Sequence, residues 1–219
     1  LEVQCFTEHS SKMRPSHDLI RTCPHCALYF AQEAFMSKNT LGAITWTDGK
    51  RTAPMCPDVP SLVKCPHCAG LVWLERVALA NGEDVTQGKG SQKLTPRYEM
   101  PTESDLSRLL ESSNDFSVEE YKYIRVRLWW YANDIIRSNP TQKTVDYSPT
   151  QREKMAALFG MFNASMPNER IAKAEVAREL GWFDEAKVLL SSDFQGSLKK
   201  VSVKIYSYAQ RNNSTVVIL

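Results

Sequence analysis

Two copies of the sequence Cys-Pro-His-Cys, at Cys23–Cys26 and Cys65–Cys68, are the residues of this chain best suited to chemistry. Each copy places two thiols on one tight turn, and two such turns can converge on one tetrahedral metal ion. Zn²⁺ in structural sites takes four soft donors of this kind, with zinc–sulfur bonds of about 2.3 Å. The spacing therefore predicts one structural Zn²⁺ ion that is bound by all four sulfur atoms.

Disulfides, an iron centre and thiol redox catalysis remain alternative uses of these cysteines. A disulfide framework would distribute its cysteines, whereas four of the six here lie in two pairs, which favours metal binding in a reducing compartment. Cys-Pro-His-Cys also resembles the active-site motif of thioredoxin-like thiol oxidases, where it opens a helix after a strand. Here Ala69-Gly70 and a strand-like run follow the second pair, which argues against the redox alternative.

Three further donors lie near the paired cysteines. His25 and His67 are inside the pairs, where adjacent ligands fit poorly, so we expect both rings to face solvent; a mixed thiolate–imidazole shell is the alternative. Cys56 is expected to be a buried or incidental thiol rather than a fifth ligand.

The elements that must position the cysteines are short strands. The insert between the pairs has 38 residues, and Asp48-Gly49 supplies a turn signal between two runs that we predict to form a hairpin. Leu62–Lys64 and Leu71–Leu74 flank the second pair in the order typical of a zinc ribbon. We therefore predict a zinc-ribbon module over residues 13–80, which depends on its ion because roughly 70 residues build a thin core.

The segments on either side of this module lack an apolar period. Residues 1–12 are predicted to be a tail, which an expression vector could have supplied, with Met13 as a plausible native start. They have no basic start followed by an apolar stretch, so no signal peptide is visible. Residues 81–101, which include Pro96 and Pro101, predict a linker.

Residues 102–219 have helical periodicity. Ser117 with Glu120, and Ser148 with Gln151, are capping signals that mark two helix starts. Three further helices are predicted over Glu169–Leu180, Phe183–Leu190 and Ser197–Arg211. The last of these also has the alternation of a strand. The predicted fold class is thus α+β, a small β-rich zinc-ribbon module followed by an all-α helical bundle.

The stretch Ala174–Leu190 resembles the centre of a tetratricopeptide unit. Small residues at Ala174 and Ala177 would let two helices approach closely, and Gly181 would make the turn between them. One copy is visible, whereas an array stacks three or more. We therefore expect one tetratricopeptide-like helical hairpin within the bundle rather than an extended peptide groove.

Other short stretches accompany the paired cysteines, namely Gly42–Lys50, Ala53–Met55, Leu71–Leu74, Leu128–Asp134 and Ala174–Ala186. With them, most of residues 20–190 resembles a group of poorly characterised bacterial proteins. These pair an N-terminal four-cysteine zinc ribbon with a C-terminal tetratricopeptide-like helical region. The resemblance implies this architecture and brings no established activity with it.

Charge and hydropathy exclude some functions. The 27 basic and 25 acidic side chains give a net charge of +2, and no block of like charge stands out. General electrostatic adhesion to nucleic acid or to an anionic membrane is therefore not expected. No uncharged apolar run approaches the roughly 18 residues that a membrane span needs, and with no visible leader we expect a cytoplasmic protein.

These features favour a non-enzymatic protein-interaction or adaptor module, with another protein as its partner and no small-molecule substrate. Four cysteines would saturate the zinc ion and leave no position for a reactive water. Exposed aromatic and arginine side chains can anchor a partner, and the candidates are Arg127, Trp129 and Trp130. Packing inside the protein is the alternative for these aromatic side chains.

Nucleic-acid binding is the alternative function. Zinc ribbons commonly contact DNA or RNA, and four basic residues lie near the predicted knuckles and hairpin: Arg21, Lys50, Arg51 and Lys64. The even charge balance argues against it, because phosphate neutralisation needs a concentrated basic face. A thiol redox enzyme is less favoured still, and no nucleophile–base pair or phosphate loop is legible elsewhere.

Overall fold

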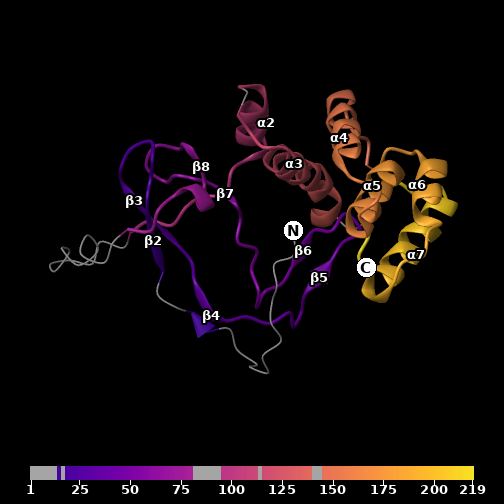
Figure 1. The fold of residues 1–219 in the computed structure, drawn as a ribbon, viewed down its shortest axis with the longest axis horizontal. Helices are drawn as coiled ribbons and strands as arrows, with labels where there is room; N and C mark the ends of the chain where they lie inside the picture. Colours follow the sequence, from indigo (N-terminus) through magenta and orange to yellow (C-terminus); the bar gives the residue numbers. More distant parts are fainter. Residues whose placement is uncertain (1–13, 16–17, 81–94, 113–114, 140–144) are drawn as a thin grey trace. The chain divides into compact units, whose positions relative to one another are not determined.

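The structure is a computed structural model that describes residues 14–15, 18–80, 95–112, 115–139 and 145–219 (Figure 1). Within these ranges short antiparallel strands come first and six α-helices follow, so the α+β prediction is confirmed at this level. Contacts divide the chain into two units. The cysteine unit comprises Leu1–Ala43 and Thr52–Asp105, and the helical unit comprises Ile44–Arg51 and Leu106–Leu219.

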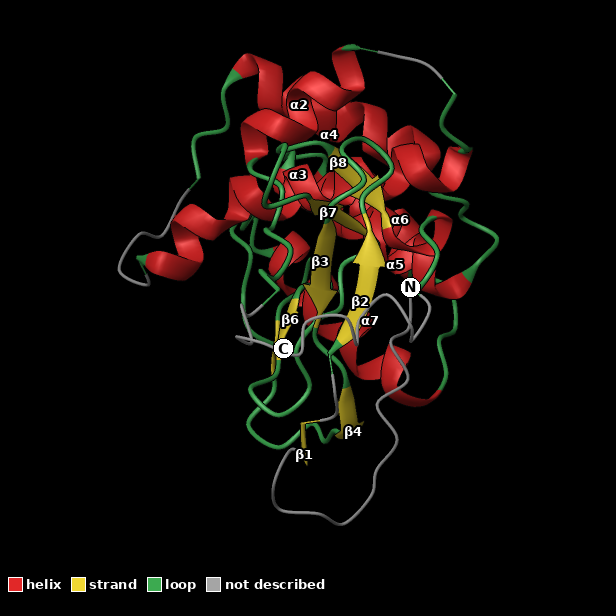
Figure 2. Ribbon diagram, turned by 90° about the vertical axis from the view of Figure 1, so that its left-hand side faces the viewer, coloured by secondary structure: helices red, strands yellow, loops and turns green. Residues whose placement is uncertain are grey.

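The cysteine unit is built from two-stranded antiparallel sheets. The pairs are β1 (Arg14–Pro15) with β4 (Phe35–Ser37), β2 (Leu19–Thr22) with β3 (Tyr29–Gln32), and β7 (Leu62–Lys64) with β8 (Leu71–Trp73). Figure 2 shows β2 and β3 side by side. A short 3-10 helix, η1 (Leu74–Arg76), follows β8. The strands predicted around the second cysteine pair are confirmed, and β2 with β3 provides an unpredicted equivalent around the first.

A segment from the predicted linker joins these two hairpins. The amide of Ala31 in β3 donates to the carbonyl of Pro96 at 2.9 Å. Lys64 in β7 exchanges two backbone hydrogen bonds of 2.9 Å with Glu99. Residues 96–99 therefore complete the backbone hydrogen bonding of both hairpins, whereas residues 81–94 lie outside the described part and stay a predicted linker.

The hairpin predicted in the insert is present as β5 (Ile44–Thr45) and β6 (Arg51–Thr52). Gly49 has a φ of +79°, which explains the glycine in this turn. The C-terminal residues pair with β5, since the amide of Leu219 donates to the carbonyl of Thr45 at 2.8 Å. Residues 44–51 belong to the helical unit and not to the cysteine unit, although they lie between the cysteine pairs in sequence.

Six helices follow: α2 (Glu103–Glu111), α3 (Val118–Ser138), α4 (Pro149–Met161), α5 (Pro167–Glu179), α6 (Phe183–Leu190) and α7 (Gly196–Gln210). The predicted capping box of Ser117 with Glu120 is formed, and the helix start predicted at Ser148 is confirmed and contains a second capping box, with Gln151. The segment predicted as a helix over Ser197–Arg211, whose sequence also allowed a strand, is the helix α7. The remaining predicted helix bounds agree to within a few residues.

Helices α5 and α6 pack closely against each other (Figure 1). Ala174, Ala177 and Ala186 are fully buried, because small side chains let the two backbones approach. Gly181 adopts a φ of +84° at the end of α5, where the amide of Trp182 donates to the carbonyl of Ala177 at 2.8 Å. The turn predicted at Gly181 is therefore confirmed.

The tip of the β5–β6 hairpin is anchored in the helical unit. The side chain of Asp48 is completely buried and forms an ion pair with the guanidinium of Arg137 in α3. Asn133 donates from Nδ2 to Asp48 Oδ2 at 2.9 Å, and the indole N–H of Trp130 donates to the carbonyl of Asp48 at 3.0 Å. Three side chains of one helix thus hold one turn residue.

Replacement of Asp48 by Asn should lower the free energy of unfolding of the helical unit by roughly 2 kcal/mol, because it removes the buried one of the two carboxylates that pair with Arg137 and leaves Asp134 as its partner. Urea unfolding followed by far-UV circular dichroism measures this loss. Asp184→Asn is the control, since that carboxylate is 97% exposed and its loss should have no measurable effect. Equal stability of both variants would contradict the anchoring role of Asp48.

Candidate metal centre

The four paired cysteines meet at one point in the cysteine unit. Their sulfur atoms all lie within 4.8 Å of one another, as predicted from the sequence. The Sγ–Sγ distance is 3.8 Å between Cys23 and Cys68 and 3.8 Å between Cys26 and Cys65. Sulfur atoms about 2.3 Å from a tetrahedral zinc ion would be about 3.8 Å apart, whereas a disulfide needs about 2.05 Å. The donor set therefore fits Zn²⁺.

The two turns that carry the sulfur atoms have the same backbone. Each is followed by an alanine whose amide donates back to the first cysteine of its pair, Ala27 to Cys23 at 2.9 Å and Ala69 to Cys65 at 3.0 Å. Both alanines are left-handed, with φ values of 59° and 58°. This conformation ends the turn and lets β3 or β8 begin, so each pair sits between two strands and not at the start of a helix.

The histidines of the two turns form reciprocal hydrogen bonds. His25 Nε2 donates to the carbonyl of Leu71 at 3.0 Å, and His67 Nε2 donates to the carbonyl of Tyr29 at 2.9 Å. Each histidine thus reaches the first residue of the strand that follows the other turn. Both rings are exposed, as expected, and neither belongs to the sulfur cluster. The repeated histidine was the only sequence signal of this cross-connection.

Burial divides the four cysteines into two kinds. Cys23 and Cys65, the first of each pair, are buried against Phe30, Val63 and Val72, whereas Cys68 is exposed. Burial raises the pKa of Cys65 to about 12, although backbone amides of its turn oppose the shift. Burial acts to raise the pKa of Cys23 as well, but hydrogen bonds from the backbone amides of its turn outweigh burial and lower this pKa to about 7.

Because burial raises the pKa of Cys65 to about 12, this thiol keeps its proton at neutral pH unless a cation is bound. A bound Zn²⁺ ion would supply the positive charge that keeps all four sulfur atoms deprotonated. Metal binding therefore releases protons, and acid should displace the ion.

Gly70 is required by a close approach between the two turns. A Cβ atom at this position would lie 2.6 Å from Cδ2 of His25 and 3.3 Å from Sγ of Cys68. Both distances are shorter than ordinary van der Waals contact. Gly70 therefore lets His25 pass over the second turn to reach Leu71.

The structure places the three candidate partner-binding residues on α3 in different environments. Trp129 is 2% exposed, and its indole N–H donates to Glu179 at 2.6 Å in the core of the helical unit. Trp130 and Arg127 are half-buried, and the guanidinium of Arg127 lies 5.3 Å from the centroid of the Trp130 ring. Trp129 is thus packed inside the protein, and the other two reach the surface.

The basic residues Arg21, Lys50 and Lys64, which were considered for nucleic-acid binding, make contacts within the protein. Arg21 donates to two backbone carbonyls that follow β8. The ammonium of Lys64 lies 3.3 Å from the carboxylate of Asp105, and that of Lys50 lies 2.6 Å from Asp134. Cys56 is buried and stands outside the metal cluster, as expected, but it is disulfide-bonded, so the prediction of a free thiol there is wrong.

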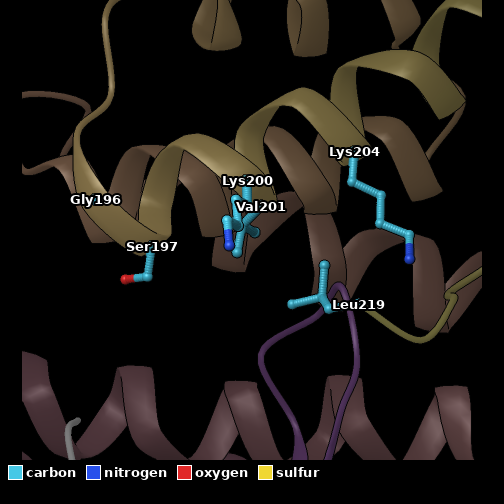
Figure 3. Close-up of a pocket in the computed structure, with 6 residues that line it drawn as sticks. All are labelled: Gly196, Ser197, Lys200, Val201, Lys204 and Leu219. Atoms are coloured by element: carbon cyan, nitrogen blue, oxygen red, sulfur yellow. The ribbon is translucent and has the colours of Figure 1, made fainter.

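A shallow depression of about 510 Å³ lies beside α7 (Figure 3). Its lining residues are Gly196, Ser197, Lys200, Val201, Lys204 and Leu219. They supply one hydroxyl and two ammonium groups, with no carboxylate or imidazole that could act as a general base beside them. We therefore assign no catalytic chemistry to this depression.

Comparison of the chain with protein-family models, with curated proteins and with solved structures finds no match. Within the described ranges, no helix is both long and apolar enough to cross a membrane. The case for function therefore depends on the geometry of this chain alone.

Elemental analysis of the purified full chain should find one zinc ion per chain, and Co²⁺ exchanged into the site should give the absorption of tetrahedral thiolate coordination. The ion should be lost on acidification because the thiolates bind protons. Replacement of the buried Cys65 by Ser should abolish binding, whereas Val188→Ser, which introduces a serine at an exposed position of α6, is the control that should retain it. Absence of metal from untreated protein that still folds would contradict the assignment.

Gly70→Ala should displace the His25 ring, and so speed the loss of zinc to a chelator several-fold through the disturbed second turn. Release can be followed with a colorimetric zinc indicator. Gly160→Ala is the matched control, because neither glycine is left-handed and a Cβ at Gly160 meets no atom within 4 Å. Equal release rates from Gly70→Ala and the unchanged protein would refute the role of the close approach.

Proposed function

We propose that this protein is a zinc-stabilised, non-enzymatic interaction module that acts as an adaptor for another protein. The observation that carries the proposal is the four-sulfur cluster with its tetrahedral spacing. Four thiolates fill the coordination shell of Zn²⁺, so the ion would organise the cysteine unit and would not activate a water molecule. We propose the zinc ribbon within the predicted range 13–80, without residues 44–51, which belong to the helical unit. The paired cysteines favour the reducing cytoplasm as the location, whereas the disulfide bond of Cys56 opposes it.

A protein partner is favoured over nucleic acid because the basic side chains near the metal centre are already occupied. Arg21 binds backbone carbonyls, and Lys64 is paired with Asp105. To bind phosphates these side chains would have to give up buried or half-buried partners, and a net charge of +2 offers little compensation.

For the partner surface we propose the half-buried part of α3 around Arg127 and Trp130. The stacked guanidinium and indole present a flat, partly apolar surface of the kind enriched at protein interfaces. We further propose that α5 and α6 form a tetratricopeptide-like hairpin, which the buried alanines and the Gly181 turn support. Trp129 would contribute by holding α3 in the core rather than by touching the partner.

Affinity capture from the native host, with mass spectrometry of the bound material, tests this proposal. A specific protein should be retained by the unchanged chain and lost with Arg127→Glu, because the charge of the proposed surface is reversed. Arg211→Glu is the matched control, since it makes the same change at an exposed position after α7 and should retain the partner. Captured material that disappears after nuclease treatment would favour the nucleic-acid alternative and contradict the adaptor.

A further inference from the structure

The helical unit buries a carboxyl group that has no cation of its own. Glu179, the last residue of α5, is 1% exposed. Its Oε2 atom lies 2.6 Å from the indole nitrogen of Trp129, 3.0 Å from Nδ2 of Asn133 and 2.9 Å from the hydroxyl of Tyr147. The other buried carboxylate of α5, Glu175, has Arg178 as a two-point partner, at 2.5 and 2.8 Å.

The hydroxyl of Tyr147 makes one contact more than its single proton can serve. Its oxygen lies 2.6 Å from Oδ1 of Asn133 and 2.9 Å from Oε2 of Glu179, and both of these atoms are acceptors if Glu179 is ionised. The Tyr147 proton can satisfy only one of them. A second proton must therefore lie between Tyr147 and Glu179, which requires Glu179 to be a carboxylic acid that donates to the tyrosine oxygen.

The orientation of the Asn133 amide does not remove this requirement. As assigned, Nδ2 uses its two protons on Asp48 Oδ2 at 2.9 Å and on Glu179 Oε2 at 3.0 Å. If the amide were flipped, Oδ1 would face both carboxyl groups and two extra protons would be needed instead of one. The assigned orientation with one extra proton is the most economical arrangement.

The charges around Glu179 favour the same protonation state. Burial raises its pKa well above the usual value of 4.5, and the Glu175 and Asp48 carboxylates raise it further, against the opposing charge of Arg178. The other charged groups near it are already paired, Arg137 with Asp48 and with Asp134, and Lys50 with Asp134. Burial also raises the pKa of Tyr147, so its hydroxyl stays protonated.

We propose that Glu179 is neutral in the folded protein and that its proton locks the β5–β6 hairpin onto the helical unit. The order of donation is Glu179 to Tyr147, Tyr147 to Asn133 Oδ1, and Asn133 Nδ2 to Asp48. Ionisation of Glu179 turns the Tyr147 proton towards the carboxylate and leaves Asn133 Oδ1 without a donor. It also adds a second negative charge near Asp48, so the hold on the hairpin weakens as the proton leaves, although the Arg137 ion pair and the Trp130 hydrogen bond remain.

The sign of the pH dependence follows from this proton. Since the folded protein holds a proton that the unfolded chain loses above about pH 4.5, its contribution to stability is complete below that pH. It declines as the pH rises from there through the pKa of the folded state. Alkaline conditions should therefore weaken the lock, and acid should not.

The test compares two substitutions of one kind on one helix in the full chain, Glu179→Gln and Glu175→Gln. A glutamine at position 179 cannot both donate to Tyr147 and accept the hydrogen bonds that Trp129 and Asn133 give to the same atom, so its melting temperature should be lower near pH 5. Because the titrating proton is gone, this melting temperature should fall less between pH 5 and pH 9 than that of the unchanged protein. Glu175→Gln leaves Arg178 buried without its carboxylate and should lower the melting temperature by on the order of 10 °C at every pH.

Infrared spectroscopy supplies a second readout. The carbonyl band of a protonated carboxylic acid should be present in the unchanged protein at neutral pH, remain in Glu175→Gln, and be absent from Glu179→Gln. The protection factor of the Lys50 amide, from which the ordinary base catalysis of exchange is divided out, should fall at alkaline pH in the unchanged protein and not in Glu179→Gln. The proposal is overturned if the band is missing at neutral pH, or if the melting temperature of Glu179→Gln falls between pH 5 and pH 9 as much as that of the unchanged protein.

Discussion

Four sulfur atoms must reach one point although 38 residues separate the second cysteine of the first pair from the first of the second pair. This closure is the constraint on which the cysteine unit depends. It is met by two turns of identical backbone, each held between antiparallel strands, and by two histidines that tie each turn to the strand after the other. The turns are thus connected by hydrogen bonds as well as by the shared sulfur cluster. These bonds would assist the proposed zinc ion in bringing the distant residues together.

The insert also serves the second unit. Its middle, residues 44–51, leaves the cysteine unit and packs in the helical unit, after which the chain returns to the second cysteine pair. Both ends of this hairpin continue into the cysteine unit. The chain therefore passes between the two units three times, before Ile44, after Arg51 and after Asp105. Release of the hairpin would lengthen the flexible loop between the cysteine pairs and make metal closure less favourable. The polar anchor at Asp48 and the sulfur cluster are therefore expected to stabilise each other through the chain itself.

What could be predicted from the sequence was local. The cysteine pairs, the capping residues Ser117 and Ser148, and the Gly181 turn each carry their signal within a few positions, and all were found. The pairing of Glu99 with Lys64 has no such signal, because edge pairing depends on which strand happens to be nearby. The same holds for the hairpin. The residues Asp48-Gly49 predict the turn of the hairpin. The hairpin sequence does not show that Asp48 pairs with Arg137, which lies 89 positions later in the chain.

The two carboxyl groups of α5 show why such long-range features escape sequence reasoning. Glu175 and Glu179 are one helical turn apart, and both are buried. Charged residues with this spacing are usually found on the solvent-exposed face of a helix, so the sequence alone does not indicate their burial. Arg178 can neutralise only the nearer one with good geometry, so the other must use a proton in place of a cation. Apolar packing alone would let a short hairpin settle in several positions on a helix. The directional hydrogen bonds through Tyr147 and Asn133 are satisfied in only one position of the hairpin. Because Glu179 supplies one of the protons in these bonds, the preference for that position depends on the protonation of Glu179.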